Sequence, residues 1–290
     1  MQAAAILLHR APPTSLLLSA IVSIQLASAL AIDLFPIYGP IGVLFLRMAI
    51  GSALLCLLYR AEVVGALHKA PLGILLLGLT MVAQSGAFYE AIYRIPLGIT
   101  VSIEFLGPLG LAFATSRRPA DILCVLVAAA GVLLLTPKIG ISLDLVGVCY
   151  AVVAAAAWAC FIVISRSLSR SIPGGVGLAM AMAVSSILLL PAVGMRTLRD
   201  VAFHPGTLVT IFGVALFSAA IPSLFEYLAL KSMPAKKYGV LISLEPIVAT
   251  MIGFVLLSES LDFRAGIAIL LISTASIATA LLSRPGRLAD

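Results

Sequence analysis

Five charged side chains lie in or at the ends of otherwise apolar stretches of the sequence, and their types are suited to chemistry. They are Arg47, Glu90, Glu104, Glu226 and Glu245. A charge at the centre of a lipid bilayer costs at least about 2.5 to 3.5 kcal/mol on insertion scales, so each should face a cavity or a partner. A buried carboxylate can exchange a proton or attract an ammonium group, and a guanidinium can bind a carboxylate through two N–H groups. The expected chemistry is therefore reversible binding of protons and small charged solutes.

Two of these glutamates lie beside prolines that predict kinks. Glu104 precedes Pro108 by four residues, so the proline supplies no N–H group to the carbonyl of Glu104. Glu245 comes directly before Pro246, which biases its own backbone away from the helical region. Kinked segments with acidic side chains are suited to a cation or ammonium site within a membrane. The alternative is a protonated glutamate in a kink that only shapes packing.

Glu226 shares one helical face with Ser218 and Pro222, because the three are spaced four residues apart. A hydroxyl, a kink and a carboxylate therefore lie together, and we predict Pro108, Pro246 and Pro222 as the hinges of the chain. Glu226 is also about one turn from Lys231, so an interfacial salt bridge is the alternative to a substrate role.

The remaining polar candidates have two interpretations each. Arg47 either pairs with one of the glutamates or binds the carboxylate of a substrate. Glu90 and Arg94 are four residues apart, a spacing that favours a structural ion pair at a helix end. Trp158 interrupts a run of alanines that lets neighbouring helices approach closely, and its ring either lines a cavity or packs between helices.

The elements that must position these residues are membrane-spanning helices. Hydrophobic residues make up 62% of the 290 residues, charged residues only 10%, and the mean hydropathy is +1.20. Each apolar run has about the 20 residues that a helix needs to cross a bilayer. The runs are 14–32, 38–59, 71–89, 96–115, 119–136, 143–165, 173–195, 206–230, 238–257 and 263–282. The predicted fold class is an all-α integral membrane protein with ten transmembrane helices.

The ten predicted spans use nearly the whole chain, and the segments between them are too short or lack the motifs for several classes of protein. No stretch is long enough for a nucleotide-binding domain, and no Gly-rich phosphate loop occurs. The net charge is +6, but the Lys and Arg residues are scattered and form no basic stripe that would predict nucleic-acid binding. The histidines and cysteines show no metal-binding or nucleophile–base spacing. We therefore expect no enzyme activity, no catalytic residue, no metal site and no cofactor.

The distribution of Lys and Arg predicts the orientation. If the N-terminus is in the cytoplasm, the segments on the outer side of the membrane hold Arg94, Lys138, Arg196, Arg199 and Arg264. Most of the 18 basic residues then lie on the cytoplasmic side. The positive-inside rule thus places both termini in the cytoplasm. The alternative for the first run is a cleavable signal peptide, because His9 and Arg10 precede the run and small residues suited to signal peptidase, Ala27 to Ala31, lie at its end.

Two halves of the chain show an internal repeat. Superposing the fourth run on the ninth without gaps aligns Pro96 with Pro234 and Pro108 with Pro246. Each half, 1–140 and 141–290, then holds five spans, an odd number, so the halves enter the membrane from opposite sides. This is the inverted-repeat plan of secondary transporters. The alternative is a chance alignment of prolines and alanines.

Two motifs carry a resemblance to a known family. They run from Tyr93 to Leu109 (YRIPLGITVSIEFLGPL) and from Tyr238 to Pro246 (YGVLISLEP), and Arg47 and Trp158 also fit. The chain resembles the EamA-like branch of the drug/metabolite transporter superfamily, in particular threonine and homoserine exporters of the RhtA type. Ser243 lies within the second motif, and we add it to the candidate binding residues Glu104, Glu245, Glu226, Arg47 and Trp158.

The resemblance implies a multi-pass protein of the bacterial inner membrane that exports amino acids or related metabolites in exchange for protons. Within this fold, the alternatives are export of drugs or cationic metabolites and import of a nutrient. A membrane scaffold or sensor without transport is the alternative from another class. The small-residue helix faces are consistent with either a monomer or a homodimer in the bilayer.

Overall fold

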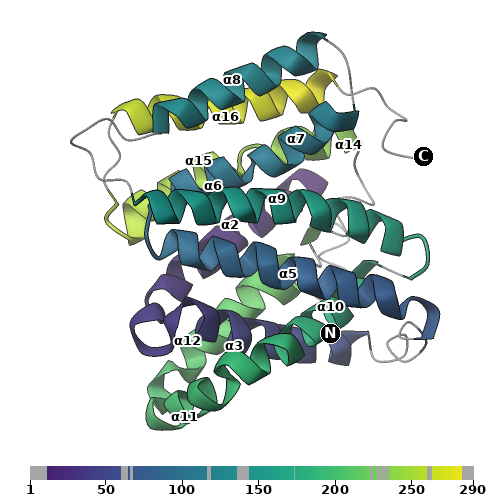
Figure 1. Ribbon diagram of the computed structural model, residues 1–290, viewed down its shortest axis with the longest axis vertical. Helices are drawn as coiled ribbons and strands as arrows, with labels where there is room; N and C mark the ends of the chain where they lie inside the picture. Colours follow the sequence, from purple (N-terminus) through teal and green to yellow (C-terminus); the bar gives the residue numbers. More distant parts are fainter. Residues whose placement is uncertain are drawn as a thin grey trace.

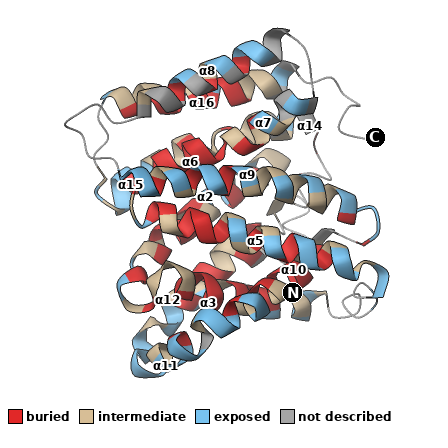
Figure 2. Ribbon diagram, viewed as in Figure 1, coloured by how far each residue is buried: buried red, intermediate tan, exposed pale blue. Residues whose placement is uncertain are grey.

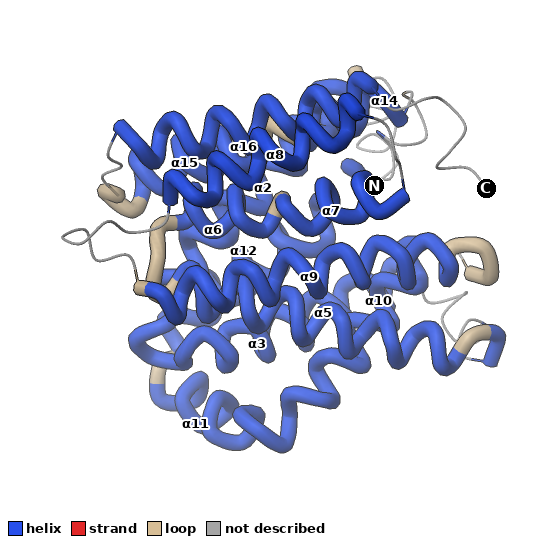
Figure 3. The backbone as a smooth tube through the Cα atoms, turned by 45° about the horizontal axis from the view of Figure 1, so that its top comes forward, coloured by secondary structure: helices blue, strands red, loops and turns tan. Residues whose placement is uncertain are grey.

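The computed structural model describes residues 12–59, 65, 68–115, 119–135, 144–172, 174–222, 225–226, 229, 233, 235–259 and 263–282. These residues form helices joined by short turns, and the described part of the chain contains no strand (Figure 3). The prediction of an all-helical protein is therefore confirmed. Lys231, the possible partner of Glu226, and the basic residues before the first run, His9 and Arg10, lie outside the described residues.

The helices follow the apolar runs closely. Their bounds are α2 Pro13–Ile32, α3 Phe35–Leu58, α5 Pro71–Ile92, α6 Leu97–Glu104, α7 Leu106–Thr115, α8 Pro119–Leu135, α9 Leu145–Leu168, α10 Gly174–Leu189, α11 Met195–Phe203, α12 Leu208–Ala215, α14 Ala235–Ile242, α15 Glu245–Leu256 and α16 Phe263–Leu282. Two π-helical segments, η1 Leu190–Gly194 and η3 Leu216–Ala220, continue α10 and α12, and a short 3₁₀ turn, η2 Pro205–Thr207, precedes α12.

By length and composition, five of the described helices can cross a membrane on their own. They are Pro13–Ile32, Phe35–Leu58, Pro71–Ile92, Leu145–Leu168 and Gly175–Val193. A sixth candidate is a pair bent by 98°, Met195–Phe203 with Pro205–Ala219. Shorter apolar helices occupy Leu97–Leu111, Val240–Leu256 and Phe263–Thr279. The membrane character of the bundle is thus evident, whereas the count of ten spans stays a prediction.

The helices lie in a stack in which neighbours in space are often distant in sequence (Figure 1). The long helices α5 and α9 pack along each other, and α10 packs on α3 and α5. At one edge α8 pairs with α16, while α6 packs on α15 between that pair and α9 (Figure 1). Burial is greatest on α6 and along α5, and it falls towards the edges of the stack (Figure 2). The candidate residues of α5 and α6 are therefore placed in the interior.

Small residues allow the seam between α5 and α10. A Cβ atom on Gly78 would lie 2.7 Å from Cγ1 of Val184, so no larger residue fits there without movement of α10. The buried hydroxyl of Ser185 donates to the carbonyl of Gly78 over 3.0 Å. Close backbone approach with an interhelical hydrogen bond is a common way to join helices where water does not drive association.

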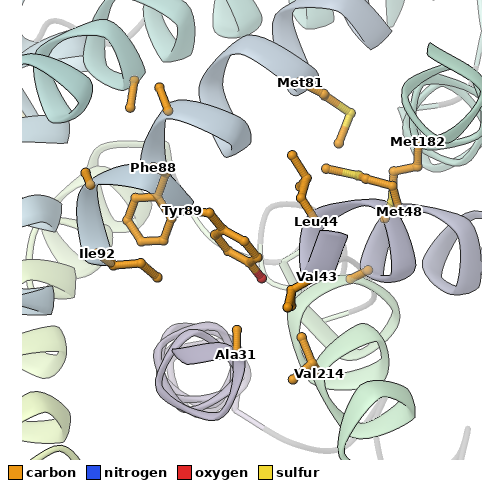
Figure 4. Close-up of a cluster of buried hydrophobic side chains, with 14 of the residues drawn as sticks. Ala31, Val43, Leu44, Met48, Met81, Phe88, Tyr89, Ile92, Met182 and Val214 are labelled. Carbon is orange, nitrogen blue, oxygen red and sulfur yellow. The ribbon is translucent and has the colours of Figure 1, made fainter. Parts of the chain in front are cut away.

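The apolar core centres on Tyr89 of α5, which is fully buried (Figure 4). Its ring extends between Ala31 of α2 and Leu44 of α3 (Figure 4). The centroid of the Phe35 ring lies 5.5 Å from that of Tyr89. Nearby, Met48 and Met182 fill the space between α3 and α10 with flexible side chains. The start of α3 bends at Gly39, whose φ of +68° only glycine adopts at little cost, before Pro40 restarts the helix.

Two helices are interrupted at corresponding places when the fourth and ninth apolar runs are aligned. α6 ends at Glu104 and α7 begins at Leu106, and α14 ends at Ile242 before α15 begins at Glu245. When Pro108 is superposed on Pro246, Leu97–Glu104 falls on Ala235–Ile242 without a gap. The prolines explain both interruptions, because each lacks the N–H group that would continue the hydrogen-bond ladder. Both helices are therefore interrupted two or three residues before the proline, whereas the role of Pro108 and Pro246 as hinges stays a prediction.

Candidate functional site

Glu104 is the most deeply buried acidic residue of the candidate set. It ends α6 and is only 6% exposed. The side-chain amide of Gln84, on α5, donates to Oε1 of Glu104 over 2.8 Å. The next residue, Phe105, packs edge-on against the ring of Trp158 from α9, with 5.1 Å between ring centroids. Trp158 therefore packs on the interruption between α6 and α7, which fixes the end of the helix that carries Glu104.

Arg47 reaches from α3 to α5. Its guanidinium donates to the hydroxyl of Ser85 over 3.3 Å and to the hydroxyl of Tyr89 over 3.4 Å. It also lies 5.4 Å from the centroid of the Tyr89 ring, within the range of a cation–π contact. The buried Nε atom of Arg47 has no hydrogen-bond partner, and no described carboxylate forms an ion pair with this residue. The guanidinium is thus held by neutral groups.

A short series of polar contacts joins Arg47 to Glu104. The hydroxyl of Ser85 is 3.4 Å from Oε1 of Gln84, and the amide of Gln84 binds Glu104. The positive and negative groups therefore belong to one polar cluster, formed by Arg47, Ser85, Tyr89, Gln84 and Glu104, within an apolar surrounding. Such a cluster is strongly oriented, because unpaired polar groups are costly in a low-dielectric interior.

A second acidic group lies on the other side of the α6–α15 contact. Glu245 is the first residue of α15, where the N-terminal end of the helix dipole favours a negative charge. The charges of Glu104 and Glu226 both act on Glu245, and those of Glu226 and Glu245 act on Tyr238 of α14. Ser243 is buried in the turn between α14 and α15. Glu245 thus lies within electrostatic range of Glu104 on one side and of Glu226 on the other.

The two principal glutamates occupy different positions in the repeat. With Pro108 on Pro246, Glu245 falls on Gly107 rather than on Glu104. A Cβ atom on Gly107 would lie 2.1 Å from the carbonyl oxygen of Ala155, so this position in the first half packs directly on α9. Glu104 therefore precedes the interruption in its helix, whereas Glu245 follows its own.

Pro222 follows a local distortion of the helix that leads to Glu226. The N–H group of Ile221 donates to Leu216 in the π-helical segment η3, and Pro222 has no N–H group to donate. The carbonyl of Phe217 is instead bound by the hydroxyl of Ser23, from α2, over 2.6 Å. α2 thus supplies a hydrogen bond that Pro222 leaves unmade, and the role of Pro222 as a hinge stays a prediction.

Glu90 and Arg94 form the predicted ion pair at the end of α5. Arg94 also lies 3.8 Å from a carboxylate oxygen of Asp144 and over the ring of Tyr150. The hydrogen bond with Glu90 raises the pKa of the Arg94 guanidinium above its ordinary value. These contacts tie the start of α9 to the end of α5, which supports a structural role for Glu90.

Known proteins match this chain over most of its length. Residues 145–281 match the EamA-like transporter family. The threonine/homoserine exporter RhtA of Salmonella typhimurium is 33% identical over 94% of this chain and 92% of its own length. The exporter of the same name from Escherichia coli K12 is 32% identical over 86% of this chain and 84% of its own length.

The chain belongs to the EamA-like transporter family.

The solved structures agree with this EamA-like fold. One crystal structure superposes with a TM-score of 0.50 at 20% sequence identity, and the match covers 95% of this chain and 99% of that one. This similarity concerns the fold alone. The family membership confirms the resemblance drawn from the two motifs, and the match to exporters agrees with the expectation that this EamA-like chain is not an enzyme.

A pocket of about 370 Å³ in this EamA-like transporter lies away from the glutamates. It is formed where the start of α5 meets the end of α9, and its lining includes Gly73, Leu76, Val163 and Ser167. None of its lining residues carries a charge, so the chemistry of the site belongs to the polar cluster instead. Within the described part of the chain, no group of three or more His, Cys, Asp or Glu residues is placed to hold a metal ion.

Three members of the polar cluster were not predicted as site residues of this EamA-like chain. They are Gln84, Ser85 and Tyr89, all on α5. Each is uncharged, so none carries the insertion cost that marks Arg47 or Glu104 in the sequence. Their spacing held a weaker signal: Ser85 and Tyr89 are four residues apart and share one helical face, and Gln84 is an amide in an apolar run.

Proposed function

We propose that this chain is a secondary active transporter of the bacterial inner membrane that exports small amino acids of the threonine and homoserine type in exchange for protons. The observation that carries the proposal is the polar cluster, which holds a guanidinium and a carboxylate in one partly buried hydrogen-bonded group. An amino acid is a zwitterion, so it presents both an anion and a cation to such a site. The exporters that share about a third of the sequence support the same substrate class.

In the proposed mechanism, the ammonium group of the substrate binds near Glu104, Glu245 and Glu226, while its carboxylate binds Arg47. Glu245 lies within electrostatic range of both Glu104 and Glu226, and like charges in a low-dielectric interior disfavour one another, so the charged form of Glu245 is costly in the absence of a cation. A proton and a substrate ammonium therefore compete for the same carboxylates. This competition links outward movement of the amino acid to inward movement of a proton.

The proposed architecture is ten transmembrane helices in two inverted repeats, 1–140 and 141–290, with both termini in the cytoplasm. The helices before Pro108 and Pro246 end at the same distance from the proline in the two halves, which supports the repeat. Broken helices at matching places in two halves are common at the binding sites of secondary transporters. The hinges Pro108, Pro246 and Pro222 would then let the halves tilt around a central site in alternating access.

Counterflow of radiolabelled threonine and homoserine into proteoliposomes, with and without a proton gradient, tests the function. We expect gradient-dependent uptake in the wild type and a loss of at least about tenfold in Glu104→Gln, which keeps the shape but removes the negative charge. Glu90→Gln is the matched control, because Glu90 pairs with Arg94 outside the polar cluster. Equal activity in Glu104→Gln and the control would contradict the assignment of Glu104.

A growth assay with cationic dyes and flux measurements on other solutes separate the remaining functions. Protection of cells against cationic dyes without amino-acid counterflow would favour a drug exporter. Absence of flux for every tested solute, with correct insertion and stable oligomers, would favour a scaffold.

A further inference from the structure

A carboxylate outside the polar cluster binds the start of the helix that carries Glu104. Glu259 follows α15, and both of its oxygens accept the N–H group of Leu97, at 3.0 and 3.2 Å. Leu97 is the first residue of α6, where N–H groups have no partner within the helix. Burial raises the pKa of Glu259, and the hydrogen bond from Leu97 opposes part of that rise. The end of α15 therefore caps α6 from another part of the chain.

The backbone around Glu259 is shaped to hold this contact. Ser258 has a φ of +54°, a conformation that non-glycine residues rarely adopt. The N–H group of Glu259 donates to the carbonyl of Gly253 over 3.1 Å. A Cβ atom on Gly253 would lie 2.2 Å from Oε2 of Glu259, so the carboxylate occupies the space that a side chain would need. A strained turn and a glycine thus place the carboxylate over α6.

The same two helices approach closely along the rest of their contact. A Cβ atom on Gly98 would lie 2.2 Å from the hydroxyl of Thr250, which itself donates to the carbonyl of Pro246 over 2.7 Å. Beyond the interruptions the chain diverges, because α7 packs mainly on α9 and α8, whereas α14 packs mainly on α16 and α2. The outer halves of the two broken helices, α6 and α15, are therefore closed on each other.

We propose that Glu259 is a positioning residue of the transport cycle: its contact with Leu97 is a latch that holds the α6–α15 end of the bundle closed, and release of the latch opens that end. The predicted topology places this end outside the cell, so the structure represents a state closed to the outside. The inference rests on the alternating access proposed above, but it does not depend on which solute is carried.

Cysteine labelling tests the latch without any substrate. In a background in which Cys56, Cys124, Cys149 and Cys160 are replaced, Ser102→Cys places a thiol on the buried face of α6, four residues from Gly98. A membrane-impermeant methanethiosulfonate is added to right-side-out vesicles. We expect Glu259→Ala to speed labelling by roughly tenfold or more, the factor that follows from losing a charge-assisted hydrogen bond.

Two further variants define the cause of the change. Glu259→Gln keeps one acceptor oxygen without the charge, so its labelling rate should fall between those of the wild type and Glu259→Ala. Glu90→Gln removes a charge near the C-terminal end of α5, on the side of the predicted membrane where the latch lies. It leaves the latch intact, so its labelling rate should equal that of the wild type. Equal rates for Glu259→Ala and the wild type would overturn the proposal.

A second reporter separates opening from loss of structure. Tyr238→Cys lies on α14, beyond the interruption, and is labelled from the other side in inside-out vesicles. If Glu259→Ala shifts the population towards the outward-open state, labelling at this position should slow while labelling at Ser102→Cys accelerates. Faster labelling at both positions would mean general loosening and would overturn the latch. A protein that showed the expected pattern but transported neither threonine nor homoserine would contradict only the proposed substrate.

Discussion

The side-chain amide of Gln84 donates to Oε1 of Glu104 over 2.8 Å, and its own oxygen lies 3.4 Å from the hydroxyl of Ser85, which binds Arg47. Two neutral side chains, Ser85 and Gln84, thus lie between the partly buried cation Arg47 and the buried carboxylate of Glu104. Gln84 orients Glu104 without neutralising it, which leaves the carboxylate able to bind a proton or an ammonium group. This arrangement gives Gln84 a role that its type alone does not indicate.

Replacement of Gln84 by leucine should weaken substrate binding. The variant removes the donor to Glu104 and leaves a buried carboxylate oxygen without a partner, a change worth roughly 1.5 to 3 kcal/mol for a bond to a charged group. We expect the KM for threonine counterflow to rise by about tenfold or more. Thr80→Val is the control, because Thr80 lies one turn earlier on α5 and bonds only to its own helix. An unchanged KM in Gln84→Leu would mean that the amide does not orient the site.

Replacement of Arg47 by glutamine should abolish discrimination between threonine and its carboxamide. The guanidinium contacts two hydroxyls and no described carboxylate, so in the proposed site its charge is available to the carboxylate of the substrate. We expect the wild type to prefer threonine by at least about tenfold and Arg47→Gln to lose that preference. Competition of the two compounds in the counterflow assay gives the ratio. Arg94→Gln should keep the preference, since Arg94 lies in the ion pair with Glu90.

Replacement of Gly107 by alanine should destabilise the bundle. The new Cβ atom would lie 2.1 Å from the carbonyl oxygen of Ala155, and a backbone atom of α9 cannot move aside without moving the helix. Overpacking of this kind typically costs about 1 to 3 kcal/mol. Gly110→Ala on the same helix is the matched control, because nothing lies within 4 Å of its added Cβ atom. Thermal unfolding in detergent should show a lower midpoint for Gly107→Ala only; equal midpoints would show that α7 is not held against α9.

Replacement of Ser23 by alanine should also lower stability, through a different cause. The variant leaves the carbonyl of Phe217 without the donor that compensates for the π-helical segment. Interhelical hydrogen bonds in membranes contribute roughly 0.6 to 2 kcal/mol. Ser28→Ala removes a hydroxyl of the same helix that bonds only to Ile24, so it should have a smaller effect. Comparison of the two unfolding midpoints checks this, and a larger effect for Ser28→Ala would contradict it.

The sequence by itself indicated that most of this protein lies in a lipid bilayer, and it predicted the places where the helices are interrupted. Apolar runs of about 20 residues predict helices in lipid, because a helix forms the hydrogen bonds of every backbone polar group within its own segment. Pro108, Pro246 and Pro222 lack the N–H group that a continuous helix needs, so the irregular hydrogen bonding near each of them follows from covalent structure. The cost of burying a charge likewise marked Arg47 and the glutamates.

Only the tertiary structure decided which groups meet. Arg47 had two interpretations in the sequence, and its described partners are neutral residues of α5 that no spacing rule connects to α3. The contact between Glu259 and Leu97 joins residues far apart in the chain, through a turn held by the backbone of Ser258. Local preferences depend on neighbours within about one helical turn, whereas these contacts depend on how whole helices pack. That packing is what turns scattered polar residues into a site.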